Sequence, residues 1–214
     1  EAKQEGEAYE WIRIDADFEW ICRTNIEDMP SYMYVSQLQQ DKDVVAQAES
    51  IQFLANKEGH KLISTFLVKT LMDNRYFHGI RTMAAMVLAQ SALKRTEWVG
   101  LFHLKKAFRE LFCLPNSPMT RSNDFSDRSM YLIQCAIPRA IAKIKGEDGR
   151  SPLEAKRFLL DLVRYNDNRG NDYSDDHYLA TLMECLAQSL TTTKKTASDL
   201  DPTMDLNAEA EEFD

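Results

Sequence analysis

The sequence has few glycines and prolines and contains no long apolar run. Glycine contributes 7 and proline 6 of its 214 residues, about half the usual share in globular proteins, which favours long helices over a turn-rich β-sandwich. No apolar run approaches the roughly 18 to 20 residues that a helix needs to cross a bilayer. The first five residues show neither an initiator methionine nor a signal-peptide pattern. We therefore expect a helical protein without a membrane span, cut from a longer chain.

Cysteine and histidine are also scarce, with four of each. They lie far apart in the sequence and form no CxxC pair or zinc-ligand spacing: Cys22, Cys113, Cys135, Cys185, His60, His78, His103 and His177. The sequence also lacks an HExxH motif, a glycine-rich phosphate loop and a GxSxG elbow. We expect the cysteines to be buried core residues in a reducing compartment. We expect no metal site, no cofactor and no enzymatic activity.

The net charge of −8 is concentrated at the two ends of the chain. Residues 197–214 carry seven acidic residues and no basic one, and residues 1–10 carry four acidic residues and one lysine. Removing these net charges of −7 and −3 leaves about +2 for residues 11–196. We therefore expect a near-neutral folded body, a disordered lead at residues 1–8 and a flexible acidic tail at residues 191–214.

Apolar and polar residues alternate over residues 12–22, which is the period of a β-strand. The pattern predicts a hairpin that turns near residues 15–17. An isolated two-stranded hairpin is marginal in water, and this one would leave Trp11, Phe18 and Trp20 without a sheet to cover. We therefore expect the rest of its sheet to lie upstream.

The period changes to that of an α-helix after Pro30. One helix is expected to begin near Ser31, and others over residues 44–55, 62–71, 77–89, 97–112, 125–145, 152–165 and 178–187. Ser31, Asp43 and Ser151 are the expected N-caps. Pro138 removes a backbone donor inside its helix and predicts a kink there.

Two of the expected helices are similar at an offset of 34 residues. Ile51 aligns with Ala85 and Leu54 with Leu88, and residues 178–187 fit the same template. Self-similarity with a period of about 34 to 47 residues is typical of stacked helix pairs. The pattern favours a mostly α, HEAT- or armadillo-like solenoid over residues 31–190, and an irregular helical bundle is the alternative.

The segment at residues 167–175 superficially resembles a calcium-binding loop. Placing Gly170 at the sixth position of such a loop puts Tyr165 at the first and Asp176 at the last, where aspartate and glutamate are required. The pattern fails, so we expect a turn between two helices, with Ser174 or Asp175 capping the second.

Six basic residues are candidate contacts for a protein partner or DNA: Arg75, Arg81, Lys105, Arg109, Arg139 and Lys143. The last four form two pairs at helical spacing, which could meet phosphates or acidic peptides or could simply lie on a solvated face. Arg75 and Arg81 flank a repeat turn on the expected concave side. There they could bind a ligand or brace neighbouring repeats.

Three sequence blocks resemble a known family. They are the segments at residues 11–15 (WIRID), 43–47 (DVVAQ) and 165–169 (YNDNR). They are similar to the TFIID subunit 2 family, the aminopeptidase-like TBP-associated factors, and the resemblance covers about residues 9–189. That family shares the layout of zinc M1 aminopeptidases, with a protease-like domain that has lost catalytic competence, a β-sandwich and a C-terminal helical solenoid. The resemblance implies that residues 9–30 end the β-sandwich and that residues 31–190 are HEAT-like repeats.

The resemblance also implies a function. We expect a nuclear, non-catalytic scaffold that acts in promoter recognition and RNA polymerase II preinitiation-complex assembly. Its expected partners are other TFIID subunits, first among them the histone-fold subunit that links to the core, with promoter DNA touched mainly by the rest of the parent protein. The alternatives are the C-terminal helical domain of an active M1 zinc aminopeptidase and an unrelated HEAT adaptor.

Overall fold

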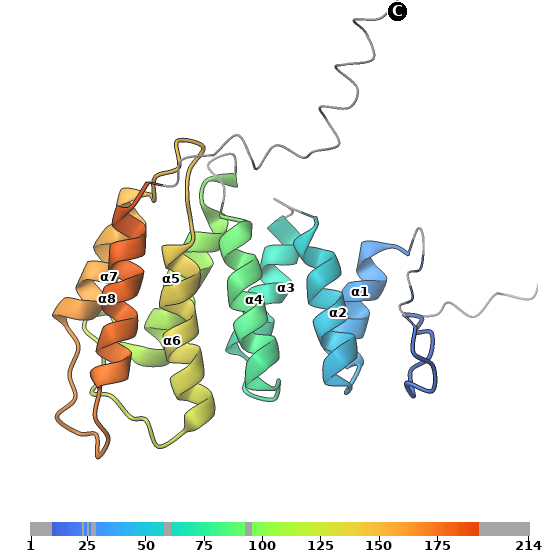
Figure 1. Cartoon of the computed structure of the whole chain (residues 1–214), viewed down its shortest axis with the longest axis horizontal. Helices are drawn as coiled ribbons and strands as arrows, with labels where there is room; N and C mark the ends of the chain where they lie inside the picture. The colour runs from blue at the N-terminus through green and yellow to red at the C-terminus, as the bar shows by residue number, and fades with distance from the viewer. Residues whose placement is uncertain are drawn as a thin grey trace, which may run out of the picture.

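A computed structural model describes residues 10–22, 24, 26, 29–57, 61–92 and 96–192. This part of the chain contains eight α-helices and no named strand (Figure 1). The helices are α1 (Ser31–Gln40), α2 (Val44–Ala55), α3 (Lys61–Met72), α4 (His78–Gln90), α5 (Val99–Phe112), α6 (Arg128–Ala142), α7 (Leu153–Arg164) and α8 (Asp176–Leu190). The prediction of a mostly α-helical chain is confirmed, and none of these helices has the length and apolarity needed to cross a membrane.

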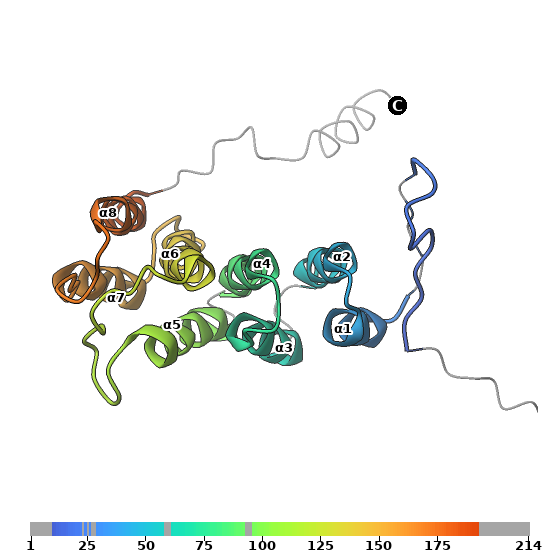
Figure 2. The same cartoon turned by 90° about the horizontal axis from the view of Figure 1, so that it is seen from below.

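The helices form two rows that run along the length of the molecule. Figure 2 shows α1, α3, α5 and α7 in one row and α2, α4, α6 and α8 in the other. Each helix of the first row packs against the helix that follows it in sequence, and α4 and α6 pack against each other and against their outer neighbours. Short connections between consecutive helices favour antiparallel pairs. Because every inner helix touches neighbours on several sides, the apolar residues form one continuous core.

A glycine sets how closely α4 and α5 approach. A Cβ atom placed on Gly100 would lie 1.9 Å from the backbone oxygen of Leu88, which is far inside van der Waals contact. Only a residue without a side chain fits at this crossing. Gly100 and Leu88 are both buried, so the crossing lies inside the core.

The predicted N-caps are only partly correct. Asp43 caps α2, since its Oδ1 accepts a 2.9 Å hydrogen bond from the backbone N–H of Val45. Ser31 is instead the first helical residue of α1, and Ser151 lies one residue before the cap position of α7, which Pro152 occupies. The hydroxyl of Ser151 is buried and has no hydrogen-bond partner among the described residues. Proline provides the extended backbone that precedes a helix without a side-chain acceptor. The usual preference for serine at the N-cap therefore did not identify the cap of α7.

Helix α6 continues through Pro138. Its N-cap is Asp127, whose carboxylate accepts hydrogen bonds from the backbone N–H groups of Ser129 and Met130. Pro138 is buried between its neighbours, so tertiary packing maintains a helix that the proline would weaken in isolation. The kink expected at this position stays a prediction.

The hairpin expected near residues 15–17 is not confirmed. The described residues from 10 to 30 form turns, bends and extended segments without a strand. Asp15 and Phe18 have positive φ angles, and the N–H of Phe18 bonds to the oxygen of Asp15 in a tight turn. The physical reason is that an alternating pattern specifies a strand only when another strand pairs with it.

The segment before α1 is attached to the first helix pair by polar contacts. The indole N–H of Trp11 donates to Asp41, and the guanidinium of Arg13 contacts both Asp41 and Asp43. Phe18 and Trp20 remain exposed. Residues 1–8 and residues 193–214 lie outside the described part of the chain, so the expected lead and most of the expected tail are not described.

Candidate functional site

A surface hollow lies between α5 and α7, which are neighbours in the same row (Figure 2). We call it the α5–α7 groove. Its lining residues are Lys105, Arg109, Leu153, Glu154, Arg157, Phe158 and Asp161, and its volume is about 400 Å³. Two of the six basic residues predicted from sequence, Lys105 and Arg109, therefore line one site.

One wall of the groove is built around an ion pair. The side chain of Lys105 is only 11% exposed and binds the carboxylate of Glu154 on α7. The Nζ atom of Lys105 and the guanidinium carbon of Arg109 lie 5.9 and 5.8 Å from the ring centroid of Phe158, within cation–π range. These contacts hold α7 against α5 and orient Arg109 at the surface.

The charges of the groove suit an acidic group beside an apolar one. Lys105 is already paired with Glu154, whereas Arg109 and Arg157 are exposed and form no ion pair within the described residues. A guanidinium presents a planar fork of donors that matches a carboxylate or phosphate. Leu153, which is 61% exposed, adds an apolar contact at the rim. Asp161 also lines the groove and would repel an anion placed close to it.

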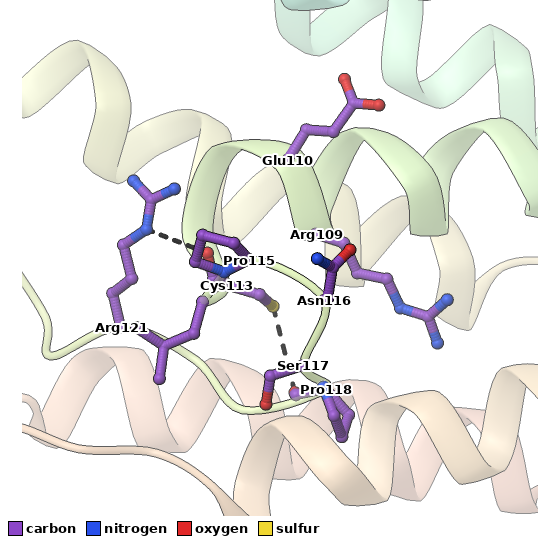
Figure 3. A pocket seen from close by; sticks show the side chains of 9 residues that line it. Arg109, Glu110, Cys113, Pro115, Asn116, Ser117, Pro118 and Arg121 are labelled. Carbon is purple, nitrogen blue, oxygen red and sulfur yellow. Dashed lines mark hydrogen bonds between the residues drawn. The ribbon is translucent and has the colours of Figure 1, made fainter.

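A second hollow of about 640 Å³ lies at the loop that follows α5, and Arg109 lines both hollows (Figure 3). We call it the loop hollow. Figure 3 shows the guanidinium groups of Arg109 and Arg121 on opposite sides of the loop, pointing away from each other. The Nε of Arg121 is already used to donate to the backbone oxygen of Cys113 at 2.9 Å. The two arginines therefore do not converge on one ligand.

The loop after α5 is held by a backbone hydrogen bond within the loop and by a hydrogen bond to the end of α7. The N–H of Leu114 bonds to the oxygen of Met119 at 2.9 Å, and the hydroxyl of Thr120 donates to the oxygen of Tyr165 at the end of α7. A loop closed in this way keeps the edge of the loop hollow in place.

Three of the four cysteines are buried, whereas Cys22 is exposed because it lies in the segment before α1, outside the helix stack. The expectation of buried core cysteines is therefore wrong for Cys22. Burial raises the pKa of the thiols of Cys113 and Cys135, and it raises the pKa of Cys185 to about 11. A nucleophilic cysteine needs a depressed pKa so that the thiolate is present near neutral pH. These three residues are therefore protonated core residues, as their apolar neighbours require.

The two arginines near the α3–α4 turn have different roles. Arg81 is 2% exposed and its Nε donates to the backbone oxygen of Leu71 at 2.8 Å, which satisfies a carbonyl at the end of α3. Burial lowers the pKa of Arg81. Arg75 is fully accessible and pairs with Asp73 at 2.6 Å. The geometry makes Arg81 a brace between helices, and only Arg75 could reach a partner.

The remaining predicted pair lies in the other row. Arg139 on α6 and Lys143, directly after the last residue of α6, are exposed, and Arg139 donates to the hydroxyl of Thr181 on α8 at 3.0 Å. Neither residue lines the α5–α7 groove with Lys105 and Arg109, so the structure does not bring the six basic residues together.

The loop at residues 165–175 joins α7 to α8, as expected. Its carboxylates bind different partners, because Asp167 pairs with Arg169 and Asp175 accepts a hydrogen bond from Asn166. The side-chain and backbone hydrogen bonds from Arg169 hold the pKa of Asp167 at about 2. Asp175 occupies the N-cap position of α8 but makes no side-chain cap bond, and Ser174, one residue earlier, accepts a hydrogen bond from the N–H of Asp176. No three potential metal ligands cluster anywhere in the described ranges.

Sequence reasoning missed the five residues that α7 contributes to the groove: Leu153, Glu154, Arg157, Phe158 and Asp161. Arg157 and Asp161 have the same four-residue helical spacing as the two basic pairs, although their charges are opposite. That signal could have marked α7 as a further polar face. It could not show that α7 lies beside α5, since nothing in the local pattern specifies which helices are neighbours.

Known proteins similar to this chain share one description. A family described as "TAF2-like, TPR repeats" matches residues 31–211. Transcription initiation factor TFIID subunit 2 of Schizosaccharomyces pombe is 45% identical over 186 residues, covering 86% of this chain and 16% of that protein. The corresponding proteins of Saccharomyces cerevisiae and Gallus gallus are 43% and 34% identical, and the chain covers 13% and 16% of their lengths. The chain thus spans less than a fifth of these relatives.

The match also corrects the expected repeat type. The helix pairs are described as TPR repeats rather than HEAT or armadillo repeats. The offset of 34 residues found in the sequence is the length of a TPR unit, in which each repeat is one helix pair. HEAT and TPR units share the same apolar helix periodicity, so the spacing of the apolar residues alone did not separate them. From the extent of the family match and the identity to these relatives, the chain belongs to the TAF2-like family of TFIID subunit 2 proteins.

Proposed function

We propose that this chain is a nuclear, non-catalytic scaffold segment of the general transcription factor TFIID, which acts in promoter recognition and RNA polymerase II preinitiation-complex assembly by binding other TFIID subunits. The family membership supports the role in transcription initiation, since the relatives are named as TFIID subunit 2. The observation that carries the binding role is the α5–α7 groove, where two unpaired arginines lie beside an exposed leucine.

The proposed ligand of the groove is a peptide segment with acidic and apolar residues. Arg109 and Arg157 would each bind a carboxylate, and Leu153 would contact an apolar side chain. Stacked helix pairs offer an extended surface suited to linear segments. We propose the histone-fold subunit that links to the TFIID core as the first partner to test.

Promoter DNA is the second candidate ligand. Lys143 and Arg139 on α6 could touch phosphates, and Arg75 is accessible at the α3–α4 turn. A body charge of about +2 over residues 11–196 releases few counterions, so we rank DNA below protein. In this proposal, promoter DNA is contacted mainly by the rest of the parent protein.

Binding titrations of the full chain would separate these ligands. The ligands are peptides that tile the tail of the histone-fold subunit and a promoter duplex, each at low and physiological salt. We expect a peptide to bind, and Arg109→Glu or Arg157→Glu to weaken that binding about tenfold, or about 1.4 kcal/mol. Arg128→Glu is the matched control, because Arg128 is an exposed arginine of α6 without an ion pair in the described residues. Tight duplex binding whose affinity decreases steeply as the salt concentration rises, without binding of any peptide, would rank promoter DNA above the protein partner.

The non-catalytic role has its own test. The alternative remains the C-terminal helical domain of an active M1 zinc aminopeptidase, and the upstream sequence would distinguish the two through an intact HExxH motif. For this chain we expect no peptidase activity and less than 0.1 zinc per chain, roughly, after dialysis. One zinc per chain would contradict the proposal. The division into a lead at 1–8, a β-sandwich end at 9–30, repeats at 31–190 and an acidic tail at 191–214 is part of the same proposal.

A further inference from the structure

Arg109 connects the α5–α7 groove to the loop hollow. Of the described residues that line these two hollows, it alone is common to both. Arg109 lies in the last turn of α5, which ends at Phe112, and its side chain is exposed (Figure 3). The two hollows therefore adjoin at one accessible guanidinium, at the point where the helix ends and the loop begins.

A single guanidinium at the junction favours one ligand over two. Arg109 offers one planar fork of donors, which one carboxylate fills when it binds in a bidentate manner. Two acidic ligands, one in each hollow, would compete for this fork and would repel each other. One ligand whose carboxylate binds Arg109 extends into both hollows without this conflict.

Acidic side chains of the chain restrict where the ligand can place its own acidic groups. Glu110 lines the loop hollow and Asp161 lines the α5–α7 groove. Each would repel a carboxylate placed beside it. The favourable positions for acidic groups of the ligand are therefore Arg109 at the junction and Arg157 in the groove, and the loop hollow favours an uncharged group.

The loop hollow offers an apolar wall for that group. Leu114, which is 45% exposed, lines it together with Pro115 and Pro118. Arg121 also lines it but points to the opposite side of the loop from Arg109 (Figure 3), and its Nε already donates to a backbone oxygen. An apolar side chain that packs against this wall removes apolar surface from water on both partners.

The size of the α5–α7 groove favours an extended ligand over a helical one. A helix with its side chains is about 10 to 12 Å across and rises about 5.4 Å per turn, so one turn occupies roughly 400 to 600 Å³. The whole groove has a volume of about 400 Å³. An extended chain advances about 3.3 Å per residue and directs successive side chains to opposite sides, which suits a groove walled by α5 and α7.

Resting on the binding role proposed above, we propose that the α5–α7 groove and the loop hollow form one binding site for a single extended peptide segment. An acidic residue of the segment binds Arg109, a second acidic residue binds Arg157, and an apolar residue packs against Leu114. The partner is therefore a linear segment in which acidic and apolar residues are interspersed.

Isothermal titration calorimetry of the full chain tests this proposal. The probe is a peptide of about twelve residues, roughly 40 Å long when extended, built from Glu-Leu-Ser triplets. We expect one peptide per chain, and we expect Arg109→Glu, Arg157→Glu and Leu114→Glu each to weaken its binding about tenfold. Met119→Glu is the matched control, because Met119 is 49% exposed in the same loop but does not line the hollow. It should leave the affinity unchanged.

A second peptide tests the conformation of the ligand. Replacing each serine of the probe by proline prevents an α-helix but permits an extended chain. We expect this peptide to bind with an affinity within about threefold of the first, since each required side chain is kept. Loss of its binding would show that the ligand is helical and would overturn the proposal.

Other outcomes would also overturn it. Two peptides bound per chain would make the hollows separate sites. Weaker binding in Arg157→Glu with unchanged binding in Leu114→Glu would confine the ligand to the α5–α7 groove, and the binding role proposed above would stand. Self-association of the chain that Arg109→Glu abolishes would make a second copy the occupant. No binding of either peptide would contradict both this proposal and the binding role.

Discussion

Arg13 binds the same carboxylate that caps helix α2, that of Asp43. The Oδ2 atom of Asp43 lies 2.5 Å from Nη2 of Arg13, while its Oδ1 atom accepts the N–H of Val45 at 2.9 Å. One side chain thus begins a helix and also attaches the segment that precedes the helix stack. The two bonds use different oxygen atoms, so neither excludes the other.

This shared carboxylate predicts an energetic coupling between Arg13 and Asp43. Asp43→Ala removes the cap and the ion pair, and we expect it to lower the free energy of unfolding by about 1 to 2 kcal/mol. Arg13→Ala should cost about 0.5 kcal/mol, with a coupling below about 1 kcal/mol. Urea unfolding of both single variants and the double variant measures these terms. Asp17→Ala, at an exposed position of the same segment, should have no effect. Strict additivity would show that the pair does not couple.

The same residue predicts a pH dependence of stability. The N–H of Val45, and after it Arg13, hold the pKa of Asp43 below its ordinary value. The folded state therefore binds this proton less readily than the unfolded state does. The stability that follows is present above about pH 4 to 5 and is lost as the pH falls through the lowered pKa.

Asp43→Asn isolates this contribution, because asparagine also caps helices but does not ionise in this range. We expect the loss of unfolding free energy between pH 6 and pH 3 to be smaller in Asp43→Asn than in the unchanged chain. An equal loss in both proteins would mean that other carboxylates, such as Asp167 with its pKa of about 2, account for the acid sensitivity.

Gly100→Ala should be among the most destabilising single-methyl additions in the chain. The added Cβ would meet the backbone oxygen of Leu88, and neither helix can move without disturbing the core. We expect a cost of about 3 kcal/mol or more in thermal or urea unfolding. Gly79→Ala is the control, since the new Cβ there meets the exposed ring of Phe77, which can turn away. It should be neutral, or stabilising by up to about 1 kcal/mol.

The same substitution should affect stability strongly at Arg81 and hardly at all at Arg75. Arg81→Met leaves the backbone oxygen of Leu71 without its buried donor, and we expect a loss of about 1 to 3 kcal/mol of unfolding free energy. Arg75→Met removes only an exposed ion pair with Asp73, so we expect no measurable change in the free energy of unfolding. Chemical denaturation compares the two. A small effect at Arg81 would argue against its role as a brace.

Local sequence patterns were sufficient to locate the helices. The expected helix at residues 62–71 lies within α3 at Lys61–Met72, and the one at residues 44–55 coincides with α2. Helix periodicity and the cap at Asp43 depend on residues within a few positions of each other. The 34-residue offset likewise indicated repeated helix pairs before any packing was known.

The placement of the functional residues depended on contacts between distant segments. Arg75 and Arg81 are six positions apart, yet one is accessible and the other is buried against α3, because burial depends on what packs above a residue. The α5–α7 groove joins Arg109 to Arg157, which no local pattern connects. The alternating pattern at residues 12–22 did not yield a strand, because a strand needs a partner and no described segment pairs with these residues. The sequence by itself determined the helices and their repetition, and only the tertiary structure decided which side chains meet, since that depends on which helices become neighbours.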